Sequence, residues 1–173
     1  RSSDLFAGLL EWIAYHRVLG VTGFMIADNG SRDGSRELLS SLARLGIVKV
    51  LDQPDVINQK PQLPAYERIL RTCAHDIDLL AFIDADEFLL PLSAEVNLVD
   101  FLTSHFSDES VSAIALNWAI FGSSGELFAE DGLVTERFTH RAPIKFNVHH
   151  NVKSVVKPER VNHFHNPHFA DLR

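Results

Sequence analysis

The sequence is poor in cysteine, in basic runs and in long apolar stretches, and each shortage excludes a class of protein. Cys73 is the single cysteine among 173 residues, so no internal disulfide can hold the fold together. The net charge of −7, with no cluster of lysine and arginine, argues against nucleic acid as a main partner. No apolar stretch approaches the roughly 20 residues of a membrane-spanning helix, and no signal peptide is evident. We expect a cytoplasmic protein, or one peripheral to a membrane, with no transmembrane segment in this chain.

Apolar residues, by contrast, are abundant, and they follow two alternating patterns. Their spacing predicts helices and short strands in turn, over residues 5–20, 38–45, 64–73 and 98–106 for helices and 24–27, 48–51, 79–83 and 113–116 for strands. Gly46 is expected to end the second helix in a left-handed conformation. The alternation predicts an α/β fold with a three-layer, mostly parallel sheet and helices on both faces. From about residue 121 the periodicity fades into loops rich in Gly, Ser, His and Pro, which are expected to carry a site rather than a core.

The most informative segment is the acidic string Asp84-Ala85-Asp86-Glu87, which directly follows the unbroken apolar run of residues 79–83. Such a run is typical of a strand that is covered on both faces. Open α/β sheets bind their ligands beyond the carboxyl ends of their strands. Carboxylates two residues apart at such a strand end could hold one hard cation, which would neutralise a diphosphate. The alternative is that these acids only begin a solvated turn.

A second polar turn, residues 27–35, follows the strand expected over residues 24–27. Its glycines tolerate positive φ, and the helix after it begins with free backbone N–H groups that favour anions. Asp28 could thereby reach a base or ribose. The alternative is a simple turn in which Asp33 or Ser35 caps the following helix.

Both motifs, in this order and about fifty residues apart, resemble glycosyltransferases of the GT-A fold, in particular the family 2 and family 92 group. The resemblance covers nearly the whole chain through the segments EWIAYHRVLGV, MIADNGSRDGS, QLPAY, FIDADEFLLP, NWAIFGSSG, LVTERF and VKSVVKPERV. It implies a single domain over residues 1–173 that is truncated at both ends, because the family's first strand precedes Arg1 and a further segment follows the last residue.

The resemblance also implies roles for individual residues around Mn²⁺ or Mg²⁺ and a nucleotide sugar. Asp86 corresponds to the direct metal ligand, Asp84 to a ribose or metal contact, and Asp28 with Asn29 to the nucleoside contact. Lys153 could meet a phosphate as a point charge, or be a solvated lysine. Glu87 could orient metal-bound water or be structural.

The segment from residue 117 to 125 moves from a strand into a Gly/Ser loop and is our candidate for acceptor binding. Sugars stack their apolar faces on aromatic rings and hydrogen-bond to polar groups, which here are Trp118, Phe121, Ser123 and Ser124. The alternative is that Trp118 or Phe121 belongs to the core.

Three histidines crowd the segment VNHFHNPHF, and neutral imidazoles are good ligands for borderline metals. We expect His168, then His165, to complete the coordination of the metal held by the acidic string. The rival interpretation is one zinc ion held by all three histidines, His163, His165 and His168, and a polar loop is the plain alternative. His149 and His150 are expected at the surface.

Transfer to an acceptor hydroxyl also needs a general base. The candidates are Glu136, first because it lies in the family-like VTERF string, then Glu126 and Asp131; a strand position for Glu136, paired with Arg137 or Arg141, explains it equally well. The sequence thus predicts a metal-dependent, inverting transferase that moves a sugar from a UDP-linked donor to a carbohydrate or glycoconjugate. The alternatives are a metal-dependent nucleotidyltransferase, a nucleotide-sugar hydrolase, or a non-catalytic binding remnant.

Overall fold

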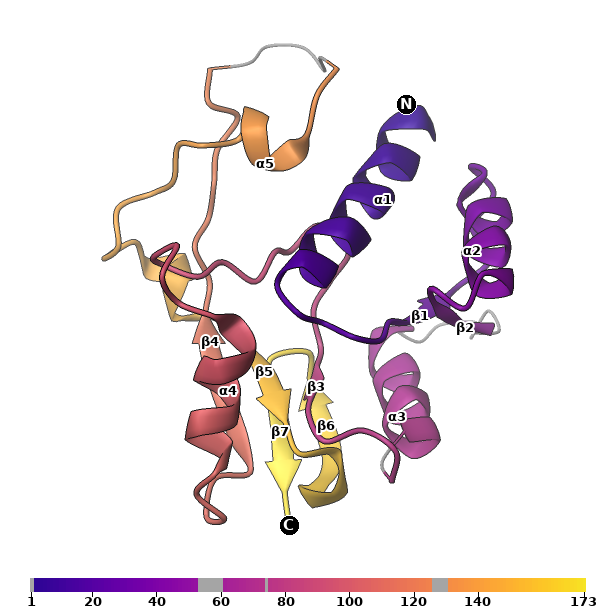
Figure 1. The fold of residues 1–173 in the computed structure, drawn as a ribbon. Helices are drawn as coiled ribbons and strands as arrows, with labels where there is room; N and C mark the ends of the chain where they lie inside the picture. Colours follow the sequence, from indigo (N-terminus) through magenta and orange to yellow (C-terminus); the bar gives the residue numbers. More distant parts are fainter. Residues whose placement is uncertain (1, 53–60, 74, 126–130) are drawn as a thin grey trace.

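The chain folds into helices and short strands of a mixed α/β structure, seen in the computed structural model of Figure 1. The structure describes residues 2–52, 61–73, 75–125 and 131–173, with side chains described from residue 8 onward. Within these ranges, no helix has the length and apolar character needed to cross a membrane. The helices are α1 (Ser2–Val18), α2 (Ser35–Arg44), α3 (Gln62–Cys73), α4 (Leu98–Phe106) and α5 (Val134–Arg137). The strands are β1 (Met25–Asp28), β2 (Lys49–Asp52), β3 (Leu80–Ala81), β4 (Ala113–Asn117), β5 (Val152–Val156), β6 (Val161–Asn166) and β7 (Phe169–Leu172).

Residues 25–52 form the β–α–β unit that the apolar pattern predicts. β1 and β2 pair in parallel with Asp28 opposite Asp52, and α2 connects them. Gly46 has a φ of 69°, which confirms the expected left-handed end of α2. Leucines on one face of α2 are buried in a cluster with α1 and the strand ends, made of Leu9, Ile13, Phe24, Leu39, Leu42 and Val48.

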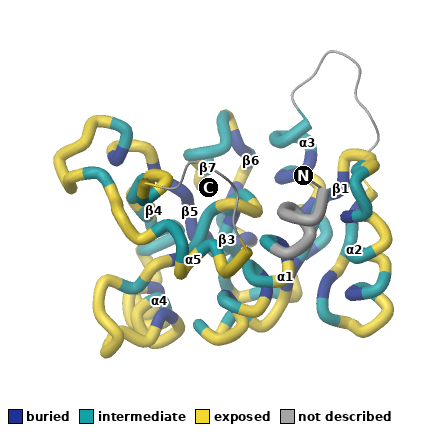
Figure 2. Tube along the Cα trace, turned by 90° about the horizontal axis from the view of Figure 1, so that it is seen from above, coloured by how far each residue is buried: buried dark blue, intermediate teal, exposed yellow. Residues whose placement is uncertain are grey.

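The larger sheet contradicts the prediction of a mostly parallel sheet. Its strand order is β3-β5-β4, and β5 runs antiparallel to both neighbours. The central strand therefore comes from residues 152–156, in the part of the chain where the sequence predicted only loops. Every residue of β5 is buried, including Lys153 and Ser154, as the dark blue of β5 in Figure 2 shows. The two polar side chains disguise the apolar pattern on which the prediction relied.

A hairpin shares the covering of this sheet with the helices, because α3 and β6 pack in one cluster with Val156 of β5. α4 and the β6–β7 hairpin lie on opposite sides of it (Figures 1 and 2). The aromatic rings of Tyr66, Phe82 and Phe164 join α3, the end of β3 and β6, with centroids 4.6 Å apart for both Tyr66–Phe82 and Phe82–Phe164. Cys73 is buried in the same cluster, and its Sγ donates to the Ile69 carbonyl over 3.0 Å. Cys73 is thus a core residue, as its helical context suggests.

Element boundaries follow local chemistry where helices are concerned. α4 spans the predicted residues 98–106, and its first turn is capped by Asn97, whose Oδ1 accepts from Asp100 N over 3.1 Å. α3 begins at Gln62, two residues before the predicted start. The strand expected over residues 79–83 shortens to Leu80–Ala81, although Phe82 N still donates to the Ser154 carbonyl.

Candidate functional site

The acidic residues form a tight turn directly after β3. Glu87 N donates to the Asp84 carbonyl over 3.0 Å, and Asp84 N donates to the Glu87 carboxylate over 3.0 Å. These reciprocal bonds close the turn and fix Glu87 as a structural member of it. Asp86 is exposed in the turn, and its carboxylate has no hydrogen-bond or ion-pair partner among the residues that the structure describes.

Lys153 links the acidic turn to the central strand β5. Its Nζ lies 2.9 Å from Asp84 Oδ2 and 3.3 Å from Glu87 Oε2. The Lys153 side chain is only 5% exposed, whereas that of Asp84 is 43% exposed. A buried ammonium that contacts two carboxylates is not the solvated lysine of the alternative interpretation. One positive charge therefore balances part of the negative charge of the turn.

Gln62 of α3 binds the other oxygen of Asp84 and is itself in contact with Tyr66 of the same helix. Gln62 Nε2 donates to Asp84 Oδ1 over 2.8 Å, and the same amide nitrogen lies 3.2 Å from the Tyr66 hydroxyl. Both oxygens of Asp84 thus have protein partners, while the Asp86 carboxylate has none among the described residues. Because of this difference, Asp84 is oriented by the fold and Asp86 is available to an external ligand.

Burial and charge act against each other in this group. Burial raises the pKa of the Glu87 carboxyl, although the Asp84 amide and the charge of Lys153 act in the opposite direction. Burial by itself would lower the pKa of Lys153, but its hydrogen bond to Asp84 and the surrounding Tyr66, Glu87 and Asp84 raise it above the ordinary value. Lys153 is therefore charged at neutral pH, and its charge favours the ionised form of Glu87.

Helix α1 clamps the chain immediately after the acidic turn, which the sequence did not predict. Trp12 Nε1 donates to the Glu87 carbonyl over 2.7 Å, and the Tyr15 hydroxyl donates to the Leu89 carbonyl over 3.0 Å. His16 Nε2 accepts from Leu89 N over 3.1 Å, while its Nδ1 lies 2.8 Å from the Trp12 carbonyl. These partners require neutral His16 with its proton on Nδ1. The sequence does contain a signal for these contacts: Trp12, Tyr15 and His16 lie on one face of an otherwise apolar helix.

The turn after β1 contains the second feature expected to bind a ligand. Asp28 is 5% exposed, and its Oδ1 accepts from Ser31 N over 3.0 Å. Its Oδ2 is buried and has no partner in the described part of the chain. A buried carboxylate oxygen without a partner costs free energy, so this atom points to a missing donor. Asn29 is exposed beside it.

The segment expected to bind an acceptor is divided between packed and exposed residues. Trp118 is half-buried, its ring meets the edge of His168 at a centroid distance of 5.3 Å, and its Nε1 is buried without a described partner. Phe121 and Ser123 are exposed, and Ser124 Oγ accepts from Thr139 N over 2.9 Å. The structure therefore fixes the loop at Ser124 and exposes an aromatic ring at Phe121.

Among the described residues, no contact brings the candidates for the general base together. Glu126 lies outside the described residues, and Asp131 is exposed. Glu136 is exposed on α5, so a strand position for it is wrong. α5 is itself attached to α1, because Glu11 accepts from Val134 N over 2.7 Å and from Thr135 N over 2.9 Å.

His168 is attached to β5, the strand that carries Lys153, and its carbonyl accepts from Ser154 Oγ over 2.9 Å. Its Nδ1 is 2.9 Å from the Val152 carbonyl. Leu80 pairs with Val156 and Phe82 N donates to the Ser154 carbonyl, so β5 runs beside the chain that leads into the acidic turn. His163 and His165 instead face Asp171 on the β6–β7 hairpin.

The expectation of a surface position fails for His149. Its ring is buried, and Nε2 accepts from Ile120 N over 2.9 Å. His150, its neighbour, is exposed as expected.

Comparison with known proteins identifies one family. The sequence model of glycosyltransferase family 92 matches residues 3–172. A glycosyltransferase family 92 protein of Oryza sativa subsp. japonica is 29% identical, over 91% of this chain and 27% of that protein. One of Ricinus communis is 30% identical, over 91% of this chain and 29% of that protein. The chain thus spans less than a third of the length of these curated relatives. No solved structure matches it significantly.

Proposed function

The chain belongs to glycosyltransferase family 92, and we propose that it binds the diphosphate of a nucleotide sugar through a divalent cation held by Asp86. The observation that carries this proposal is the contrast between two acids of one turn. Asp84 is bound by Gln62 and Lys153, whereas Asp86 is exposed and has no described partner. An oxygen ligand of this kind suits Mn²⁺ or Mg²⁺.

The charge of the turn supports the same assignment. Asp84, Asp86 and Glu87 contribute three negative charges when ionised, and Lys153 contributes one positive charge. The resulting formal charge of about −2 repels a diphosphate and attracts a divalent cation. The ion, when bound, would neutralise the diphosphate and stabilise its departure as a leaving group. In this arrangement Lys153 and Gln62 keep Asp84 oriented beside it.

Asp28 is the proposed contact for the nucleoside. Its unpartnered Oδ2 could accept a hydrogen bond from a ribose hydroxyl or from a base N–H, and Asn29 lies beside it. We take the donor to be UDP-linked, following the resemblance to family 2 and family 92 enzymes.

His168 is the proposed histidine ligand of the ion. A metal-binding histidine commonly donates its other ring N–H to a backbone carbonyl, and His168 Nδ1 has this relation to Val152. Its Nε2 would then carry the lone pair for the metal. Trp118 packs against the same ring and, with Phe121 and Ser123, supplies the surface proposed for the acceptor.

For the general base we retain Glu136 as the first proposal, with Asp131 and Glu126 as alternatives. Glu136 is exposed, and Glu11 fixes the start of the short helix that carries it. The base would remove the proton from the acceptor hydroxyl as the sugar is transferred, and we propose inversion of the anomeric centre.

Calorimetric titration of the intact protein with UDP, with and without Mn²⁺, tests the proposal. Asp86→Asn should abolish Mn²⁺-dependent binding and leave the fold intact, since the side chain has no partner in the part of the chain that the structure describes. Asp76→Asn is the matched control, because Asp76 is also an exposed aspartate in a turn. Equal Mn²⁺-dependent affinity in Asp86→Asn and the parent would disprove the metal site. Product analysis with a UDP-sugar would distinguish transfer from hydrolysis or release of pyrophosphate.

A further inference from the structure

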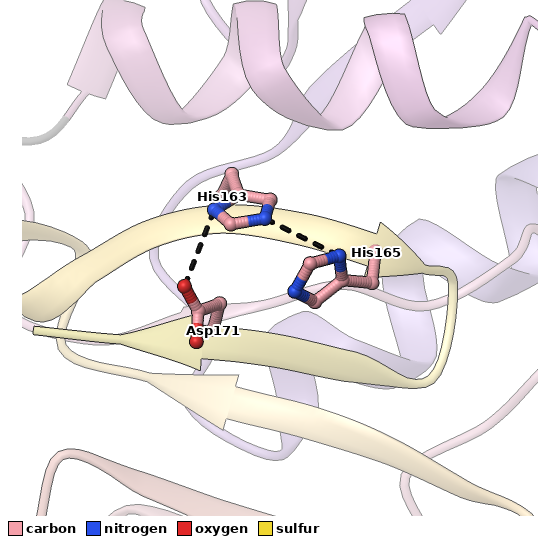
Figure 3. Close-up of side chains that lie close together, drawn as sticks. All are labelled: His163, His165 and Asp171. Atoms are coloured by element: carbon pink, nitrogen blue, oxygen red, sulfur yellow. Dashed lines mark hydrogen bonds and ion pairs between the residues drawn. The ribbon is translucent and has the colours of Figure 1, made fainter.

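A second group of metal-ligating side chains lies on the β6–β7 hairpin. His163 and His165 come from β6 and Asp171 from β7, and Figure 3 shows the three side chains turned toward one another. One ligand atom from each residue can be chosen so that all lie within 4.8 Å of one another. None of the three has a described contact with Asp84 or Asp86 in the part of the chain that the structure covers.

The hairpin register explains why these side chains converge. His163 is the direct cross-strand partner of Asp171, and irregularities in the pairing fall at Asn162 and His165. Such bulges insert an extra residue in one strand and re-aim its side chain. Phe164, between the two histidines, points the other way and is buried in the core with Tyr66 and Phe82. The two imidazoles are therefore left together on the outer face.

The three side chains are near enough to share one ion, with one ligand atom of each within 4.8 Å of the others. His163 Nδ1 lies 3.3 Å from Asp171 Oδ2, and His163 Nε2 lies 3.3 Å from His165 Nδ1. Each histidine gives one nitrogen to an ion, so His163 now faces its two partners with different nitrogens. Ligands about 2.0–2.1 Å from a tetrahedral metal are about 3.3–3.4 Å apart, so the three donors, now within 4.8 Å, would have to draw closer together as the ion binds. Two imidazoles and one carboxylate form a donor set that suits Zn²⁺ rather than Mg²⁺. We propose that His163, His165 and Asp171 bind one zinc ion, with a fourth position open to water.

This zinc site would stabilise the β6–β7 hairpin, which contributes Phe164 to the core. On the outer face, polar contacts such as His163–Asp171 link β6 to β7. On the inner face, Phe164 packs against Phe82 in the core. An ion bound by residues of both strands would link β6 to β7 on the outer face of the hairpin. The assignment places His165 at a site of its own and leaves His168 as the histidine proposed for the donor site.

Titration of the metal-free intact protein with Zn²⁺ and with Co²⁺ tests the proposal. We expect one Zn²⁺ equivalent that depends on the hairpin, and a strong visible spectrum of four-coordinate Co²⁺. His163→Ala, His165→Ala and Asp171→Asn should each weaken that equivalent by at least about 100-fold, more than the loss of an outer-shell partner does. His150→Ala is the matched control, because His150 is exposed and outside the cluster.

The two proposed metal sites are separated by their variants. Asp86→Asn should keep both the Zn²⁺ equivalent and the Co²⁺ spectrum. Retention of Zn²⁺ by all three hairpin variants, or its loss in Asp86→Asn alone, would overturn the proposal. Circular dichroism of the metal-free variants should match the parent, since the substituted side chains lie on the outer face.

Discussion

Replacing Lys153 by methionine tests whether one buried cation holds the acidic turn to the central strand. Methionine keeps much of the length and apolar volume of the lysine stem but has no charge and cannot donate. The change would leave Asp84 Oδ2 and Glu87 Oε2 without the ammonium that now lies 2.9 Å and 3.3 Å from them. Two carboxylates would then face each other beside a buried strand.

The magnitude follows from how exposed the partners are. Breaking a fully buried ion pair costs about 3–5 kcal/mol, and a charged hydrogen bond contributes about 1.5–3 kcal/mol. The Asp84 side chain is 43% exposed and that of Glu87 is 23% exposed, so water can solvate part of the charge that the lysine leaves behind. We therefore expect Lys153→Met to reduce the free energy of unfolding by about 2–3 kcal/mol at pH 7.

The loss of unfolding free energy in Lys153→Met should become smaller as the pH falls. Without Lys153, the pKa of the Glu87 carboxyl, which burial already raises, would rise further. A carboxyl with a raised folded-state pKa binds more protons in the folded than in the unfolded state, so acidification stabilises the fold. The free energy of unfolding of the variant should accordingly fall furthest below that of the parent near pH 7. This difference should become smaller between about pH 6 and pH 4.5.

Urea denaturation across this pH range measures both quantities. Lys145→Met is the matched control, because Lys145 is exposed in a loop, and it should change stability by less than about 0.5 kcal/mol. The reasoning fails if Lys153→Met is no more destabilising than the control, or if its deficit is the same at pH 7 and pH 4.5.

Two further predictions concern the other buried polar groups. Asp28→Asn keeps an acceptor for Ser31 N and removes a buried charge, so thermal stability should be unchanged or higher, while UDP affinity measured by calorimetry should fall by about 1–3 kcal/mol. Lower stability with unchanged UDP affinity would contradict the nucleoside assignment. His16→Gln should destabilise the protein at pH 7, because the ring joins Trp12 to Leu89. Burial lowers the pKa of His16, so below about pH 6.5 the unfolded state takes up the proton first and the parent loses up to about 1.4 kcal/mol per pH unit. The gap between parent and variant in urea denaturation should shrink from pH 7 to pH 5, and a constant gap would refute the neutral, clamping role of His16.

Helices and the position of the acidic turn could be predicted from the sequence because their causes are local. Leu39 and Leu42 recur at helical spacing, and Asn97 supplies a cap within the segment that it caps. Asp84 and Asp86 likewise follow an apolar run that ends at Ile83. Apolar spacing and helix caps involve residues only a few positions apart, so they can be recognised in the sequence alone.

The sequence by itself determined the family, the β–α–β unit and the residues of the acidic turn. Only the tertiary structure decided that β5 is the central strand, and that it runs against β3 and β4. Lys153 and Ser154 are polar, and they are stable inside a sheet because Asp84 and the backbone of His168 receive their hydrogen bonds. Those partners lie 69 and 14 residues away in the sequence, respectively. A buried strand with polar side chains needs hydrogen-bond partners, and here these partners are too far away in the sequence for a local pattern to show them. The contacts of α1 with Glu87 and Leu89 also join residues that are far apart in the sequence.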